Sequence, residues 1–333
     1  MILVTGGTGL VGGHLLWHLL QENDRVVAIR RTSSNLRPIR TIFSFYTSNP
    51  DEYLARIEWR KADVLKPSSL QDALQGISII YHCAAIVISG VGNDSLLDTN
   101  VIGTRNVVRA ALETNVKKFC FVSSIAACGE SDATEMIFEN SIWTDNPNRS
   151  LYSRSKYYSE QEVWQGIGEG LNAIIVNPGV ILGVSGNDTG SSQLFSQVQK
   201  GLLFYTNGGT GYVGVLDVAK AMLLLTKSKI TGERFILVAE NCSNKKILCW
   251  MADGLGKRRP FIGIGKKALW FVGLLSESLG KIFRFRPLID RATARTATNR
   301  KYYSSNKIEN SIGFTFTPIE QCISEACKFR LKN

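Results

Sequence analysis

The 333-residue sequence predicts an α/β protein built around a doubly wound parallel sheet. Over about the first 240 residues, short apolar runs alternate with longer amphipathic runs, which is typical of parallel strands covered on both faces by helices. Four glycines (Gly6, Gly7, Gly9 and Gly12) follow the first apolar run, where a strand would turn into a helix. After Pro178 the alternation loosens, and we expect a smaller, mostly helical C-terminal domain there.

The alternation places the individual elements along the chain. Strands are predicted at residues 2–5, 26–29, 57–64, 77–82, 118–124, 171–176 and 234–238. Helices are predicted at residues 14–20, 67–74, 100–113, 152–166 and 215–225. These elements predict a first domain of residues 1–178, to which 207–240 returns, and a cap of residues 179–206 and 241–333. In the cap, an amphipathic helix is predicted because apolar residues recur at helical spacing at Leu269, Val272, Leu275, Leu279 and Ile282.

The composition is that of an ordinary globular protein, with 44% hydrophobic and 20% charged residues. It excludes a disulfide-stapled miniprotein, a coiled coil and a disordered chain. Seven scattered cysteines without a C-x-x-C pair indicate reduced thiols. No apolar run approaches the roughly 20 residues that span a bilayer, and we expect a cytoplasmic protein. His14 and His18 have a metal-compatible spacing but no third ligand, so we expect no metal.

The positive charge is concentrated at one end of the chain. The net charge is +11, and residues 254–333 alone carry 16 basic and 5 acidic residues, whereas residues 1–253 are neutral. Three interpretations stay open for the basic stretch 257–301: the solvated face of a cap helix, a site for an anionic substrate tail, or peripheral contact with an anionic membrane. Nucleic-acid binding is not expected, because no nucleic-acid-binding module accompanies the charge.

The glycine cluster indicates a dinucleotide site. Gly6, Gly9 and Gly12 form a G-x-x-G-x-x-G motif between the first strand and the first helix. Glycine permits a positive φ and lets the backbone approach a pyrophosphate closely. The helix that follows supplies free N–H groups and the positive end of its dipole. This context predicts a Rossmann-type nucleotide-binding domain.

The end of the second strand indicates which dinucleotide binds. Proteins that prefer NAD place an acidic residue there for the ribose 2′-hydroxyl. This chain has Arg30 and Arg31 instead, followed by hydroxyl side chains that would suit a 2′-phosphate. We therefore expect NADP, with NAD as the alternative. Asp63, at the end of the third strand, is placed to contact the adenine.

Three side chains are candidates for catalysis. Tyr152 and Lys156 are four residues apart and share a helix face, and Ser124 ends the fifth strand. A free tyrosine has a pKa of about 10, and an ammonium group about 4 Å away would lower it toward neutrality. Tyr152 would then transfer a proton to or from a substrate oxygen that Ser124 polarises.

The chain resembles the extended short-chain dehydrogenase/reductases of the NAD-dependent epimerase/dehydratase superfamily. The matching segments are TGGTGLVG (5–12), DV (63–64), YHCAA (81–85), NVIGT (100–104), VSSIAACG (122–129), YSRSK (152–156), NPG (177–179) and YVGVLDVA (212–219). The resemblance implies that Asn100 stabilises the active-site helix and that Lys156 also holds the nicotinamide ribose. It implies cofactor contacts at Thr8, Leu10, Val11, Val64, Ala84, Ala85, Asn177, Gly179 and Val180.

Within this superfamily, the Arg30–Arg31 strand end is similar to dihydroflavonol 4-reductases and 3β-hydroxysteroid dehydrogenases. Sugar-nucleotide dehydratases follow the catalytic hydroxyl with an Asp-Glu pair, where this chain has Ile125 and Ala126. The leading hypothesis is an NADP(H)-dependent oxidoreductase that acts on a small-molecule secondary alcohol or ketone. A nucleotide-sugar 4-epimerase and a non-catalytic NADP sensor stay open. The resemblance also implies a homodimer through the helices that contain Asn106 and Tyr157.

Overall fold

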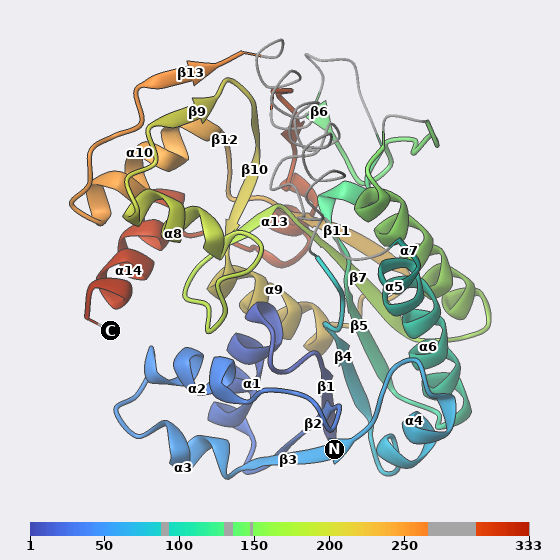
Figure 1. The fold of residues 1–333 in the computed structure, drawn as a ribbon. Helices are drawn as coiled ribbons and strands as arrows, with labels where there is room; N and C mark the ends of the chain where they lie inside the picture. The colour runs from blue at the N-terminus through green and yellow to red at the C-terminus, as the bar shows by residue number, and fades with distance from the viewer. Residues whose placement is uncertain (88–92, 130–135, 147–148, 266–297, 333) are drawn as a thin grey trace, which may run out of the picture.

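The computed structural model describes residues 1–87, 93–129, 136–146, 149–265 and 298–332. Within these residues, seven parallel strands form the central sheet in the order β11-β7-β5-β4-β1-β2-β3 (Figure 1). The strands are β1 (Ile2–Thr5), β2 (Val26–Arg30), β3 (Ile57–Lys61), β4 (Ile79–His82), β5 (Lys118–Val122), β7 (Ala173–Pro178) and β11 (Glu233–Leu237). The predicted fold class is confirmed.

Helices cover both faces of this sheet (Figure 1). One face packs against α1 (Leu10–Glu22), α2 (Arg37–Ser44) and α9 (Val215–Lys227). The other packs against α4 (Pro67–Ala73), α6 (Gly103–Glu113) and α7 (Leu151–Gly168). In β2, Val26 and Ala28 enter the first apolar cluster, whereas Val27 and Ile29 enter the second. Because successive side chains alternate across a strand, a sheet buried on both faces needs uninterrupted apolar runs.

A smaller layer of strands and helices forms a third apolar cluster. Here β8 (Val180–Leu182), β10 (Gly209–Gly214) and β12 (Glu240–Ser243) pair, and α8 (Ser192–Gln199), α10 (Asn244–Gly254) and α14 (Ile319–Lys332) pack against them. Two short ribbons pair β9 (Phe204–Thr206) with β13 (Ile262–Ile264) and β14 (Tyr302–Tyr303) with β6 (Met136–Ile137). The remaining elements are α3 (Pro50–Leu54), α5 (Asn93–Leu97), η1 (Asp98–Ile102), η2 (Ile125–Ala127) and α13 (Asn306–Ile312).

One predicted feature differs from the observed structure, and two others are not tested by it. The predicted amphipathic helix through Leu269 and Ile282 lies outside the described residues. The helix predicted from residue 100 begins earlier, with a π-helical turn at Asp98–Ile102. The proposed division into two domains stays a prediction. In the part of the chain that the structure describes, no helix combines the length and the apolar character needed to cross a membrane.

Candidate active site

The glycine loop forms a tight turn between β1 and α1. Gly6 has a φ of +68°, and a Cβ there would lie 2.7 Å from the backbone nitrogen of Ala84. A Cβ on Gly12 would lie 2.3 Å from the Gly6 carbonyl oxygen, which also accepts a hydrogen bond from the Gly9 N–H at 2.9 Å. Side chains are thus excluded from a cradle at a helix N-terminus, which fits a pyrophosphate. The other predicted contact positions of this motif, Thr8, Leu10 and Val11, lie in the turn and the first turn of α1.

Basic side chains gather at the carboxyl ends of β2 and β3. Arg30 ends β2 and pairs in register with Lys61, which ends β3. Arg31 follows and is exposed, and its backbone N–H donates a hydrogen bond to the Ser34 hydroxyl at 3.0 Å. The structure thus places three cationic side chains beside the expected position of a cofactor ribose, with a serine in the same turn.

Asp63 and Val64 form the turn that follows β3. The Asp63 carboxylate accepts a hydrogen bond from the Leu65 N–H at 3.0 Å, so it stabilises its own turn. The Val64 carbonyl accepts a hydrogen bond from the Asn106 side chain at 2.9 Å. Gly103 in α6 is required here, since a Cβ would lie 2.8 Å from the Val64 side chain. The predicted adenine contact of Asp63 stays a prediction.

A buried chain of hydrogen bonds connects β1 and β4 to the helix that begins near residue 98. The Thr5 hydroxyl accepts bonds at 3.1 Å from the two backbone N–H groups after β4, and therefore donates to His82 Nδ1 at 2.7 Å. His82 Nε2 then donates to the Thr104 hydroxyl at 3.1 Å, which donates to the Asn100 carbonyl at 2.6 Å. Burial lowers the pKa of His82 to about 3, so the imidazole is neutral. This chain of hydrogen bonds fixes the backbone at Cys83 and Ala84, directly before Ala85.

Asn100 connects this strand end to α7. Its side chain accepts a bond from the Ile86 N–H at 2.7 Å and donates to the Ile86 carbonyl at 3.0 Å. Its side-chain amide also donates to the Ser155 hydroxyl at 3.0 Å, and its backbone carbonyl accepts a bond from the Ser159 hydroxyl at 2.6 Å. Both serines lie on α7, so Asn100 holds the helix that contains Tyr152.

The structure brings the hydroxyl groups of Ser124 and Tyr152 together. Ser124 follows β5 and caps η2, where its side-chain oxygen accepts a hydrogen bond from the Ala126 N–H at 3.1 Å. Tyr152 lies in the first turn of α7, after the N-cap Ser150. Burial raises the pKa of Tyr152, and its side-chain hydrogen bond with Ser124 opposes that shift. Two side-chain hydroxyls therefore lie close together at the carboxyl end of the sheet.

Lys156 lies one turn further along α7 and is 2% exposed. Its ammonium group donates to the Val122 carbonyl at 2.8 Å and lies 4.7 Å from the centre of the Phe121 ring. Burial lowers the pKa of Lys156 to about 8, and the Glu160 carboxylate opposes this. The sequence led us to expect that Lys156 controls the pKa of Tyr152. In this structure burial has the largest effect and raises the pKa of Tyr152, so the expected lowering toward neutrality is not found. The Lys156 ammonium instead binds the Val122 carbonyl at the end of β5.

Sequence reasoning missed a buried ion pair behind the catalytic candidates. Glu160 is 1% exposed and accepts hydrogen bonds from the Ser123 hydroxyl at 2.7 Å and the Asn177 amide at 2.9 Å. Its second oxygen accepts from the Arg234 guanidinium at 2.9 Å. The Asn177 amide also donates to the Ser124 carbonyl at 3.0 Å. A signal was present in the sequence, since Glu160 is four residues after Lys156 on the same helix face.

The predicted cofactor positions after β7 are fixed by the small sheet. A Cβ on Gly179 would lie 2.5 Å from the carbonyl oxygen of Gly211 in β10. Val180 begins β8 and pairs in register with Tyr212. The Asn177 side-chain oxygen is buried and has no hydrogen-bond partner among the described residues, so it is an unused acceptor at the end of β7. Contacts of these residues with a nicotinamide stay predictions.

The paired histidines of α1 serve packing. His14 is fully buried, accepts a hydrogen bond from the Tyr46 hydroxyl at 2.5 Å, and donates to the Val184 carbonyl at 2.8 Å. Burial lowers the pKa of His14 to about 4, so it is neutral. The loop after β8 is thereby attached to α1. Over the described ranges, no group of three or more histidine, cysteine, aspartate or glutamate side chains is arranged to hold a metal.

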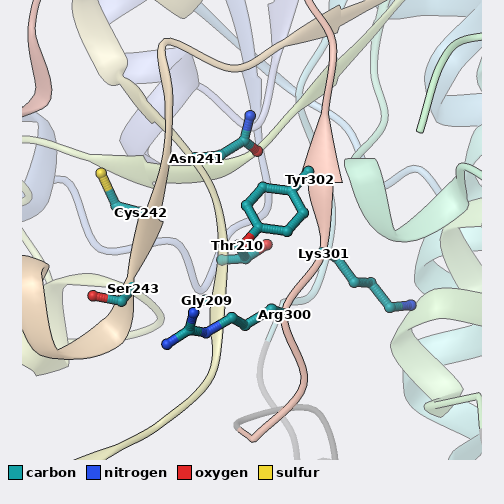
Figure 2. A pocket seen from close by; sticks show the side chains of 8 residues that line it. All are labelled: Gly209, Thr210, Asn241, Cys242, Ser243, Arg300, Lys301 and Tyr302. Atoms are coloured by element: carbon teal, nitrogen blue, oxygen red, sulfur yellow. The ribbon is translucent and has the colours of Figure 1, made fainter. Parts of the chain in front are cut away.

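A small pocket lies away from the catalytic candidates, between β10, β12 and the segment that leads into β14 (Figure 2). Its volume is about 60 Å³. It is lined by Gly209, Thr210, Asn241, Cys242, Ser243, Arg300, Lys301 and Tyr302. The Asn241 side chain bridges to the backbone of Tyr303 with two bonds of 2.9 Å. None of the predicted site residues lines this pocket, although six of its residues belong to the predicted cap segment 241–333.

Comparisons with known proteins identify the family of the chain. The chain is 27% identical to sterol demethylase protein B of Methylococcus capsulatus, over 97% of this chain and 96% of the relative. It is 25% identical to cinnamoyl-CoA reductase 1 of Petunia hybrida, over 98% and 91%. The crystal structure of gox2253 superimposes with a TM-score of 0.82 and 29% identity, covering 100% and 98% of the two chains. The model of the NAD dependent epimerase/dehydratase family matches residues 2–237, and the chain belongs to this family of enzymes.

Proposed function

We propose that this protein is an NADP(H)-dependent oxidoreductase that transfers a hydride between nicotinamide and a secondary alcohol or ketone. The observation that carries the proposal is the contact between the Ser124 and Tyr152 hydroxyls, with Lys156 buried on the same helix. Such an arrangement can move one proton at a substrate oxygen while hydride is exchanged at the adjacent carbon.

The protonation states of Tyr152 and Lys156 favour carbonyl reduction at neutral pH. Because burial raises the pKa of Tyr152, its hydroxyl is protonated and can donate to a carbonyl oxygen. Ser124 donates a hydrogen bond to the same oxygen and keeps it beside the tyrosine. Lys156, with a pKa of about 8, is mostly protonated at pH 7 and stabilises the negative charge left on the phenolate. In the oxidative direction Tyr152 accepts the proton.

The chain's own residues fit a phosphorylated dinucleotide. The Gly6–Gly12 cradle would hold the pyrophosphate, and Arg30, Arg31 and Lys61 would neutralise a 2′-phosphate. When bound, the nicotinamide supplies or accepts the hydride. Ala84, Ala85 and Asn177 would line the path toward the ring. The cationic strand ends support NADP over NAD.

The relatives' names support carbonyl chemistry, since several are named as reductases of cinnamoyl-CoA or of a tetraketide α-pyrone. We extend this to a small-molecule carbonyl substrate. The cytoplasmic location and the homodimer stay predictions.

The test follows NADPH oxidation by the purified protein with a panel of ketones and aldehydes. Tyr152→Phe should lower the rate by about 10²- to 10⁴-fold, which is the usual contribution of a general acid. Arg30→Ala/Arg31→Ala should weaken NADPH binding and leave NADH binding unchanged, as measured by thermal shift. Turnover that persists in Tyr152→Phe would refute the assignment of the acid. Epimerisation without net NADPH consumption would favour the 4-epimerase, and NADPH binding without any turnover would favour a sensor.

A further inference from the structure

An exposed apolar surface lies on the ribbon formed by β9 and β13 (Figure 1). We call Leu203, Phe204, Phe261 and Ile262 the ribbon patch; their exposed fractions are 39%, 45%, 52% and 38%. Phe204 and Ile262 are partners in register, so their side chains share one face of the ribbon. The Phe261 and Ile262 N–H groups both donate to the Leu203 carbonyl at 3.1 Å, so the backbones of Leu203 and Phe261 lie side by side at the start of the ribbon.

Basic side chains border the ribbon patch. Lys200 precedes β9, and Lys257 and Arg258 precede β13; all three are exposed. The Arg258 guanidinium lies 4.4 Å from the centre of the Phe261 ring, so charge and apolar surface are contiguous. The nearby acidic residue Asp253 is neutralised within the chain by Arg259. Among the described residues, the ribbon patch therefore combines four large apolar side chains with a border of three exposed basic side chains.

The segment that leads into β13 is basic. Residues 254–265 carry three basic and no acidic residues. An apolar patch with basic residues around it matches the interface of an anionic bilayer, where apolar groups enter the headgroup region and cations face lipid phosphates. In Figure 1 the ribbon lies at the opposite end of the molecule from β2 and β3, so docking there leaves the glycine loop accessible.

Other partners match the ribbon patch less well. A single-stranded nucleic acid stacks its bases on aromatic rings, whereas Leu203 and Ile262 are aliphatic. A second copy of this chain would bring the same basic border against itself, and like charges repel. A bilayer surface satisfies both the apolar and the cationic groups.

We propose that the ribbon patch docks the protein peripherally on an anionic lipid bilayer. Leu203, Phe204, Phe261 and Ile262 enter the headgroup layer, and Lys200, Lys257 and Arg258 pair with lipid phosphates. This docking does not depend on the proposed reductase activity, because it uses no residue of the glycine loop or of the Ser124–Tyr152 pair.

The test is flotation of the full chain with vesicles of phosphatidylglycerol and phosphatidylcholine in equal parts, compared with phosphatidylcholine alone. Wild-type protein should bind the anionic vesicles, and raised salt should weaken the binding. Phe204→Ser/Phe261→Ser should reduce the partition coefficient by about tenfold or more. Lys257→Gln/Arg258→Gln should reduce it by about fivefold for each charge removed.

Matched control variants remove exposed apolar or basic side chains outside the ribbon patch. Leu224→Ser alters an exposed leucine of α9, and Lys117→Gln/Lys229→Gln removes two exposed lysines that precede β5 and β11. Both controls should bind vesicles as the wild type does. Thermal melting and NADPH titration of every variant show whether the fold and the cofactor site are intact, which separates a docking failure from a failure of the proposed function.

Three results would overturn the proposal. One is equal binding to neutral and anionic vesicles. Another is wild-type binding by both ribbon variants. The third is a ribbon-dependent association with a second copy of the chain, or with RNA, in place of vesicle binding.

Discussion

Replacing Glu160 by glutamine should lower the free energy of unfolding by about 3–5 kcal/mol, because it removes one partner of a buried ion pair. The Glu160 side chain is 1% exposed and that of Arg234 is 17% exposed, so little water reaches the guanidinium that remains. One carboxylate oxygen also accepts bonds from Ser123 and Asn177, while the other accepts the bond from Arg234. A glutamine has only one acceptor oxygen, so it cannot accept bonds at both positions. Glu160→Gln/Arg234→Met removes both charges and should recover part of the lost stability.

Urea unfolding, followed by circular dichroism, measures these differences. The matched control is Glu162→Gln on the same helix, whose partner Arg105 has a 47% exposed side chain. This surface pair should contribute less than about 1 kcal/mol. The reasoning would be refuted if Glu160→Gln cost no more than Glu162→Gln, or if the double variant were as unstable as the two single variants combined. A second readout is the pH dependence of the rate of NADPH oxidation. Glu160 raises the pKa of Lys156, so the part of the profile that follows the titration of Lys156 should move to lower pH in Glu160→Gln.

Three further predictions rest on single positions. Gly12→Ala should abolish NADP(H) binding in a thermal-shift titration, because its Cβ would lie 2.3 Å from the Gly6 carbonyl oxygen; an unchanged response would contradict the cradle. Lys156 has a pKa depressed from 10.5 to about 8, so it binds its proton less tightly when folded and wild-type stability gains as pH rises from 8 to 10.5. The unfolding free energy of Lys156→Met minus that of the wild type should therefore fall by about 3 kcal/mol between pH 8 and 10.5, and a constant difference would refute this prediction. His14 has a pKa lowered from 6.5 to about 4, so wild type should lose stability as pH falls through that window, whereas His14→Leu should lose less in acid melts.

The central sheet was predictable because its signal is local. A strand buried on both faces must be apolar at every position, and the residues of β1, β2, β5 and β7 show this in uninterrupted runs. The short helix α2 was not predicted, because its local signal is weak. Its apolar side chains, Ile39, Ile42 and Phe43, are buried at helical spacing, but they cover little more than two turns and leave a weak periodicity.

The candidate site was predictable where its chemistry lies within one segment. The glycine loop and the Tyr152–Lys156 pair are each short local motifs, and the parallel sheet places the loop after β1 and Ser124 after β5 at the same edge. The π-helical turn at Asp98–Ile102 could not be read from periodicity. It is accompanied by tertiary bonds from Asn100 to Ile86 and Ser155, which a sequence pattern does not contain.

Two buried networks hold α7 in place, and together they explain why the site is built as it is. From one side, His82 and Thr104 fix Asn100, which bonds to Ser155 and Ser159. From the other, Glu160 joins α7 to the ends of β5, β7 and β11 through Ser123, Asn177 and Arg234. Because α7 presents Tyr152 to Ser124, both networks fix the relative position of these two side chains, and under the proposed function they would set the geometry of proton transfer. The bonds of both networks join residues from distant elements, so one sequence could not predict them, whereas the motifs behind the proposed chemistry are local.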